Sequence, residues 1–152
     1  MKTLGIYLTF SGNCEEALNF YKQALGGEIL SMQRFESVPS EKLADSDKKK
    51  IMHSEFKSEN IYFMASDSMP EYPVTSGSNI TLSLNFTDEK EQETVFNNLA
   101  AGGKVTMPLA DAFWGAKFGM LVDKYGFNWM VNCEKSKKLA INPVQNQSLK
   151  YL

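Results

Sequence analysis

The chain has 152 residues, of which 43% are hydrophobic and 22% charged, and its formal net charge is −2 at pH 7. This composition is typical of one globular domain with a sizeable core, and so small a net charge gives no electrostatic reason to expect a nucleic-acid partner. No apolar run approaches the roughly 20 residues that span a bilayer, and the first residues lack the apolar core of a signal peptide. We therefore expect a cytoplasmic protein with no membrane partner. Cys14 and Cys133 are expected to be reduced, although the sequence leaves a disulfide open.

The first half of the chain reads as a strand, a helix and three further strands. Alternating apolar residues predict a strand over 4–10. Asn13, with Glu16 three positions later, predicts a capped helix start. Apolar spacings of three and four carry that helix to Gly26-Gly27, which can end it in a left-handed conformation. The remaining strands are predicted over residues 28–35, 51–56 and 61–65, the last two as a hairpin.

A polar segment, 36–50, interrupts this pattern and contains Pro39 and the run Lys48-Lys49-Lys50. We predict an exposed loop with a short helical turn. The three lysines are typical of a solvated, charged loop.

The second half repeats the order of the first. A linker rich in proline and serine, about 67–78, precedes it. Asp88 and Glu91 predict a second capped helix, and Gly102-Gly103 ends it. The strands around that helix are predicted over 80–86, 104–109, 117–122 and 128–133. For the polar tail, 135–152, we predict no structure.

Matching residues in the two halves stand 76 positions apart, which indicates a duplication. The pairs are Phe10 and Phe86, Phe20 and Phe96, Gly26 and Gly102, and Gly27 and Gly103. We predict an α+β fold of two βαβββ modules, about 1–66 and 79–134, within a single domain. A four-stranded sheet with one helix leaves its other face uncovered. We therefore expect the two halves to pair into curved mixed sheets around a cleft with the helices outside, and a homodimer could add cover or exchange modules.

Four segments resemble PhnB-like proteins of the glyoxalase / bleomycin-resistance / extradiol-dioxygenase superfamily, also called vicinal oxygen chelate. These segments are 7–21, 52–55, 64–67 and 114–129. The resemblance covers about residues 4–133 and implies the two-module βαβββ fold. Many relatives carry a methyltransferase label that this fold does not support, and the sequence has no glycine-rich nucleotide turn of the usual kind.

The resemblance also implies where a metal would sit, because metal-dependent members place His or Glu on the first and last strand of each module. Those positions fall here at Ile6 or Tyr7, at Phe63 or Met64, at Asn79 and at Met130. Such side chains are poor ligands for a divalent metal. The chain has one histidine, so a two-histidine site would need His53 from both subunits of a dimer. We expect no metal and no cofactor.

His53, on a predicted strand beside Ser54 and Glu55, is the best candidate for a catalytic residue. Histidine side chains ordinarily titrate near neutral pH, which suits general acid–base chemistry or ligand binding. The alternative is a strand histidine whose hydrogen bonds are satisfied by its neighbours.

Three further features have a functional and a structural interpretation. Trp114 lies in a predicted loop where its ring could cover a pocket mouth, whereas most of the other aromatic residues suit core packing. Asp111 and Asp123 are conceivable catalytic acids, but aspartate near a turn more often caps it. Cys14 lies at a helix N-terminus, where the dipole lowers a thiol pKa, yet a buried apolar role is favoured.

The leading hypothesis is a metal-free protein that binds a small molecule in the sheet cleft and works as a homodimer. The expected lining residues are Tyr7, His53, Phe63, Asn79, Trp114 and Met130. The alternative is a metal-dependent lyase, isomerase or dioxygenase with a site completed across a dimer. A third possibility is an interaction module whose tail docks on a partner.

Overall fold

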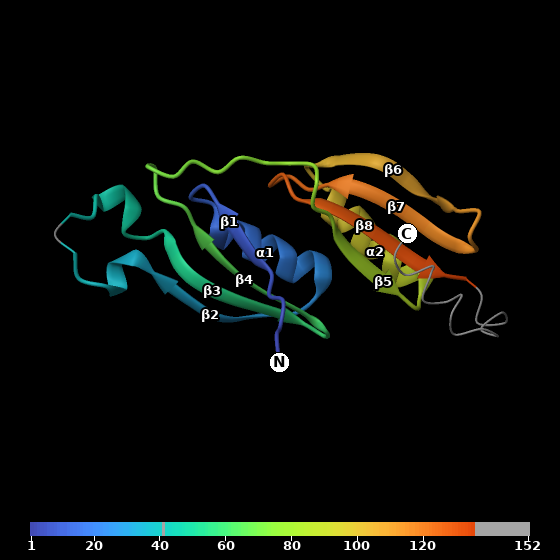
Figure 1. Ribbon diagram of the computed structural model, residues 1–152, viewed down its shortest axis with the longest axis horizontal. Coiled ribbons are helices and arrows are strands. Elements are labelled where there is room, and N and C mark those ends of the chain that lie inside the picture. Colours follow the sequence, from blue (N-terminus) through green and yellow to red (C-terminus); the bar gives the residue numbers. More distant parts are fainter. Residues whose placement is uncertain (41, 136–152) are drawn as a thin grey trace. The chain divides into compact units, whose positions relative to one another are not determined.

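The computed structural model describes residues 1–40 and 42–135, which form two compact units that divide between Thr75 and Ser76 (Figure 1). The division falls inside the predicted linker. Each unit has the order strand, helix, strand, strand, strand. The predicted tail lies outside the described residues, apart from Lys135.

Unit 1 is a four-stranded mixed sheet with one α-helix. Its elements are β1 (Tyr7–Phe10), α1 (Cys14–Leu25), β2 (Glu28–Arg34), β3 (Ile51–Ser58) and β4 (Ile61–Asp67). The strand order is β1-β4-β3-β2, with β1 parallel to β4 and the other neighbours antiparallel. Two short 3₁₀ helices, η1 (Phe35–Ser37) and η2 (Asp45–Asp47), lie in and beside the segment for which we predicted a helical turn.

Unit 2 repeats this topology. Its elements are β5 (Leu82–Phe86), α2 (Glu89–Ala100), β6 (Lys104–Asp111), β7 (Ala116–Val122) and β8 (Asn128–Glu134). The order is β5-β8-β7-β6, with β5 parallel to β8. The predicted α+β fold of two βαβββ modules is therefore confirmed.

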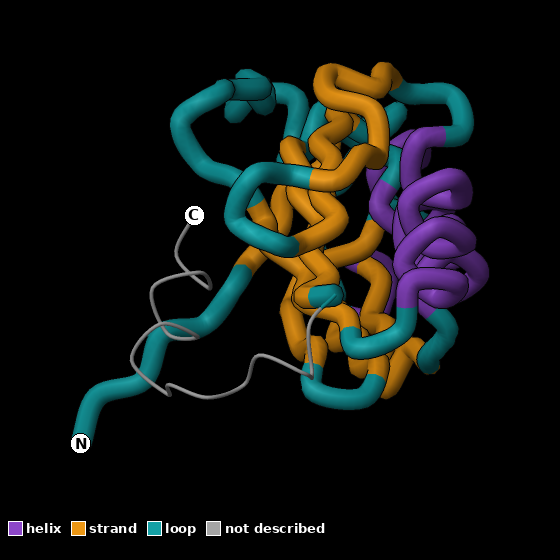
Figure 2. The backbone as a smooth tube through the Cα atoms, turned by 90° about the vertical axis from the view of Figure 1, so that its right-hand side faces the viewer, coloured by secondary structure: helices purple, strands orange, loops and turns teal. Residues whose placement is uncertain are grey.

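In each unit the helix lies against one face of the sheet (Figure 2), and the buried core residues lie between the two. In unit 1, Tyr21 of α1 meets the ring of Phe63 edge-on at 5.9 Å, and Phe56 stacks on Phe63 at 4.8 Å. In unit 2, Val95, Phe96 and Leu99 of α2 are buried, as are Leu84, Leu121, Trp129 and Val131 of the strands. This packing leaves the opposite face of each sheet without a helix of its own unit.

The two helices begin differently, although the sequence predicted the same kind of cap. Asp88 accepts a hydrogen bond from the Lys90 amide at 3.1 Å, as predicted. Asn13 occupies the corresponding position before α1, but its side chain makes no capping bond. The carboxylate of Asp67, at the end of β4, takes that role by accepting from the Gly12 and Cys14 amides. The prediction for Asn13 was wrong because a residue distant in sequence supplies the acceptor.

Each Gly-Gly pair ends a helix and lets the next strand pass close to its neighbour. Gly26 and Gly102 have φ of 67° and 75°, in the left-handed region that favours glycine. A Cβ on Gly27 would lie 2.5 Å from the Lys57 carbonyl oxygen, and one on Gly103 would lie 2.2 Å from that of Val122. The repeated pair is thus required twice for the same steric reason.

The first strand of unit 2 starts later than predicted. β5 begins at Leu82, so Asn79 and Ile80 precede the strand. The side-chain Nδ2 of Asn128 donates to the carbonyls of Gly77 and Ile80 at 2.8 and 3.0 Å. These bonds hold this segment beside β8. Among the described residues, neither α-helix has the length and apolar character needed to cross a membrane.

Candidate functional site

The helix-free face of the unit 1 sheet, which we call the first open face, carries the side chains of Tyr7, Thr9, His53, Glu55, Tyr62 and Met64. Successive side chains of a strand point to opposite faces, and these residues alternate with the buried Leu8, Phe10, Ser54, Phe56, Phe63 and Ala65. The face is therefore polar and aromatic, whereas the opposite face forms the core.

Tyr7 and His53 meet on this face from two strands that are not neighbours. The Tyr7 Oη lies 3.3 Å from His53 Nδ1, and the two ring centroids are 5.9 Å apart. Tyr7 belongs to β1 and His53 to β3, so the side chains reach each other across β4. Tyr7 is 47% exposed and the His53 side chain 35%. A phenol and an imidazole are thus in contact and accessible to a ligand.

Glu55 and Tyr62 extend this polar contact along β3 and β4. His53 Nε2 lies 4.0 Å from Glu55 Oε1, a distance that suits charge attraction but exceeds a hydrogen bond. Desolvation by neighbouring atoms, followed by the negative charge of Glu55 and its hydrogen bond with the phenol, raises the pKa of Tyr62. Sequence reasoning missed both residues as site candidates. The alternation of strand β3, which places Glu55 two positions after His53, was the signal available for Glu55.

The six predicted lining residues belong to both units. Tyr7 and His53 come together in unit 1, whereas Trp114 and Met130 belong to unit 2. Phe63 is 2% exposed and packs in the core, so its assignment to a ligand-facing surface is corrected. Asn79 precedes β5 and does not belong to the sheet.

Strand register identifies the residues that occupy the ligand-facing positions predicted for Phe63 and Asn79. Tyr7 pairs with Met64, and Ser83 pairs with Met130 in the same parallel arrangement of the second sheet. A slip of one residue moves a side chain to the other face of a strand. Met64 therefore replaces Phe63, and Ser83 replaces Asn79.

The helix-free face of the unit 2 sheet, which we call the second open face, carries Ser83, Asn85, Phe118, Met120, Met130 and Asn132. Trp114, in the loop between β6 and β7, meets Phe118 edge-on at 5.4 Å. Its indole Nε1 donates to Asn132 Oδ1 at 3.4 Å. Met120 and Met130 are neighbours in the register of β7 and β8. This face is therefore mostly apolar with amide groups. Asn132, two positions after Met130, is a further residue that sequence reasoning missed.

The side chains at the metal positions of the superfamily do not fit a divalent metal. Register gives Tyr7, Met64, Ser83 and Met130 at the four positions, that is, a phenol, a hydroxyl and two thioethers. Protein sites for such metals use imidazole, carboxylate or thiolate ligands. Within residues 1–40 and 42–135, no group of three or more His, Cys, Asp or Glu residues could hold a metal ion.

The remaining candidates have structural roles. Cys14 is fully buried, and burial raises the pKa of its thiol to about 12, so the helix terminus does not activate it. Asp123 Oδ1 accepts from the amides of Tyr125 and Phe127, which confirms that it caps a turn. Asp111 forms an ion pair with Lys135. Cys14 and Cys133 are both free thiols.

The comparisons with known proteins agree with this architecture. The model of the family named 3-demethylubiquinone-9 3-methyltransferase matches residues 2–132. Protein YjdN of Escherichia coli (strain K12) is 33% identical over 143 residues, which cover 88% of this chain and 97% of YjdN. A PhnB protein from Bacillus cereus is 31% identical, with a TM-score of 0.74 over 87% of this chain and 99% of that one. This chain belongs to the PhnB-like family.

Two further structures place the PhnB-like chain among its relatives. PA1353 from Pseudomonas aeruginosa is 44% identical, with a TM-score of 0.76 over 87% of this chain and 98% of that one. A glyoxylase/bleomycin resistance protein/dioxygenase domain from Frankia sp. EAN1pec is 11% identical, with a TM-score of 0.65 over 90% and 94% of the two chains. At that identity the likeness shows the fold alone. The PhnB-like chain therefore has the fold of the glyoxalase / bleomycin-resistance superfamily.

Proposed function

We propose that this PhnB-like protein binds a small, flat molecule on the first open face, without a metal. The contact between Tyr7 and His53 carries the proposal, because it brings two accessible hydrogen-bonding rings together on a surface that α1 does not cover. Ligand sites combine apolar or aromatic surface with a few convergent polar groups. Tyr62 and Met64 would supply the apolar surface, and Tyr7 and His53 would supply the polar groups.

The charges around this contact favour a neutral ligand that carries a hydroxyl or carbonyl group. Tyr7 can donate or accept a hydrogen bond, and so can His53, depending on its tautomer. Glu55 lies on the far side of the imidazole and disfavours an anion there. The second open face, with Trp114 beside Asn132, offers an aromatic surface and an amide of its own.

We further propose that a second copy of the chain adds cover to these faces, so that the protein acts as a homodimer in the cytoplasm. Two sheets that each have one face without a helix of their own unit support this arrangement. The two free, buried thiols suit a reducing compartment. The alternative, a lyase, isomerase or dioxygenase whose metal is held across a dimer, gains no support from the side chains at the four register positions.

The site assignment can be tested by a thermal-shift screen of small aromatic alcohols and ketones, followed by calorimetric titration of a hit. We expect His53→Gln or Tyr7→Phe to weaken that hit about tenfold, since one lost hydrogen bond costs about 1–1.5 kcal/mol. The melting temperature should change by less than about 3 °C, because both side chains are partly exposed.

Lys22→Gln is the matched control, because Lys22 is an exposed polar residue of α1, which packs on the opposite face of the sheet. The affinity of this control variant for the hit should equal that of the unmodified protein. Unchanged affinity in both site variants would refute the assignment, and so would a loss of fold in both. Trp114 suits this test less well, because its ring packs on Phe118 and its replacement would also cost stability.

A further inference from the structure

Unit 1 also contains a polar cavity of about 600 Å³ beside the turn between β1 and α1. Its lining comes from that turn, from the first turn of α1, from the last residues of β2 and β4, from the first residue of β3, and from the segment between β2 and β3. The lining residues are Gly12, Glu15, Arg34, Glu36, Ser46, Lys49, Lys50, Ile51 and Asp67. It shares no residue with the first open face, so it is a separate place for a ligand.

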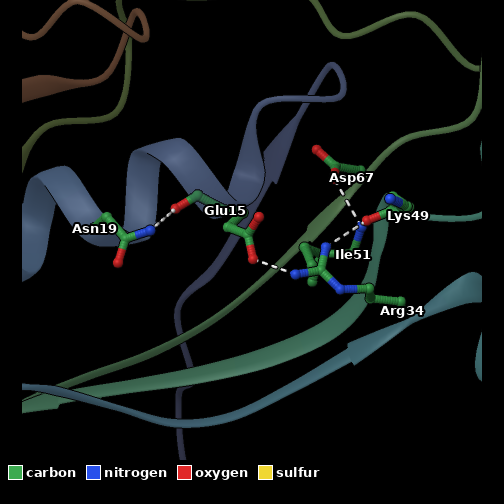
Figure 3. A network of polar contacts seen from close by, with 6 residues as sticks. All are labelled: Glu15, Asn19, Arg34, Lys49, Ile51 and Asp67. Carbon is green, nitrogen blue, oxygen red and sulfur yellow. Dashed lines mark hydrogen bonds and ion pairs between the residues drawn. The ribbon is translucent and has the colours of Figure 1, made fainter.

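Two of the three acidic residues in this lining already have partners. Both oxygens of Asp67 accept backbone hydrogen bonds, Oδ1 from Gly12 and Cys14 at 2.9 Å and Oδ2 from Ile51 at 2.8 Å. Glu15 forms an ion pair with Arg34 through its Oε2 (Figure 3). Glu36 is the acidic residue of the lining whose carboxylate has neither an ion pair nor a hydrogen bond to another described residue.

The cationic residues of the lining are Arg34, Lys49 and Lys50. Arg34 Nη1 donates to the Lys49 carbonyl at 2.7 Å and Nη2 to Glu15, which orients the guanidinium (Figure 3). A guanidinium has five N–H donors, so these two contacts leave others unused. Lys50 forms an ion pair at 2.7 Å with Asp47, a residue that does not line the cavity. In residues 1–40 and 42–135, the Lys49 ammonium has no ion pair.

This arrangement also distinguishes the three consecutive lysines from one another. Lys48 pairs with Asp45 at 2.6 Å and does not line the cavity, whereas Lys49 lines it and has no acidic partner among the described residues. A guanidinium held in place beside such an ammonium suits an oxygen anion, because charge-assisted hydrogen bonds to such groups are the strong ones.

We propose that this cavity binds a small oxyanion, the carboxylate or phosphate group of a metabolite, through Lys49 and Arg34, with the Ser46 hydroxyl as a further donor. Glu36 opposes the anion and limits its affinity. The site is independent of the function proposed for the first open face.

The test is a titration of the full chain with inorganic phosphate and, separately, with acetate. The NMR chemical shifts of the Gly12 amide and the Arg34 side chain report binding and give the dissociation constant. K49Q should weaken binding about two- to fivefold, in keeping with one exposed charge pair. K48Q removes the same charge from the neighbouring residue outside the lining and should leave the dissociation constant unchanged. Tighter binding of phosphate than of acetate would identify a phosphoryl ligand, and the reverse a carboxylate.

E36Q should change the affinity in the opposite direction from K49Q. It should tighten phosphate binding about twofold, since it removes the negative charge that opposes the anion. H53Q should have no effect, which separates this site from the first open face. Equal weakening by K48Q and K49Q would show a general charge effect and overturn the proposal. Shifts confined to residues outside the lining would also overturn it.

Discussion

Asp67 joins three segments of unit 1 through hydrogen bonds to its carboxylate. Its carboxylate accepts hydrogen bonds from three backbone amides that belong to the turn after β1, the start of α1 and the start of β3. It is 4% exposed, and it does the work that the sequence pattern assigned to Asn13. A carboxylate can satisfy three donors at once because each oxygen has two lone pairs.

Asp67→Asn should therefore destabilise the protein by about 1–3 kcal/mol, because one oxygen becomes an NH₂ group facing backbone donors. Urea unfolding followed by circular dichroism measures this change. Asp45→Asn is the control, since Asp45 is almost fully exposed in its ion pair with Lys48, and its cost should stay below about 0.5 kcal/mol. Equal costs in the two variants would contradict the role of Asp67.

At the scale of elements, the duplicated glycine pairs explain why the two halves share one helix-to-strand connection. The first glycine of each pair takes a positive φ, and the second lets β2 or β6 pass close to the backbone of the hairpin beside it. The sequence showed the repeat and the end of each helix. It could not show the close approach, because the carbonyls of Lys57 and Val122 come from another strand.

Gly27→Ala and Gly103→Ala should each destabilise the protein by roughly 1–3 kcal/mol, as overpacking does elsewhere. The added methyl group would lie 2.5 and 2.2 Å from a carbonyl oxygen. Gly5→Ala is the control, because the nearest atom to its new methyl group would be the end of the Met64 side chain at 3.8 Å. Thermal unfolding measures the stability of the three variants. If Gly27→Ala and Gly103→Ala are as stable as Gly5→Ala, the backbone adjusts to the added methyl group and the prediction is wrong.

At the scale of the whole molecule, two modules with the same topology carry different chemistry on their open faces. The first open face has a phenol, an imidazole and a carboxylate, whereas the second is mostly thioether, aromatic and amide. By strand register, the positions where the resemblance implies a metal carry Tyr7, Met64, Ser83 and Met130. The superfamily fold is kept, but these side chains are not those of its metal sites.

Addition of Mn²⁺, Ni²⁺ or Zn²⁺ should consequently shift the melting temperature by less than about 1 °C. A real site saturated a hundredfold above its dissociation constant would raise it by roughly 5–10 °C. Differential scanning calorimetry, with a chelator-treated sample as reference, measures the shift. A large stabilisation that His53→Gln abolishes would instead support a metal shared between two chains.

The sequence by itself determined the two βαβββ modules, because strand alternation, helix periodicity and glycine pairs are local signals. It also located His53 and Tyr7 as candidates. Only the tertiary structure decided that these two side chains meet across β4, that Met64 rather than Phe63 faces outward, and that Asp67 caps α1. Strand pairing decides such features, since a slip of one residue reverses every side chain and contacts between distant segments leave no local pattern. Lys49 is the clearest example. The ion pairs of Lys48 and Lys50 follow from a spacing of three residues, whereas the place of Lys49 in a cavity depends on where β2 and β4 end and β3 begins.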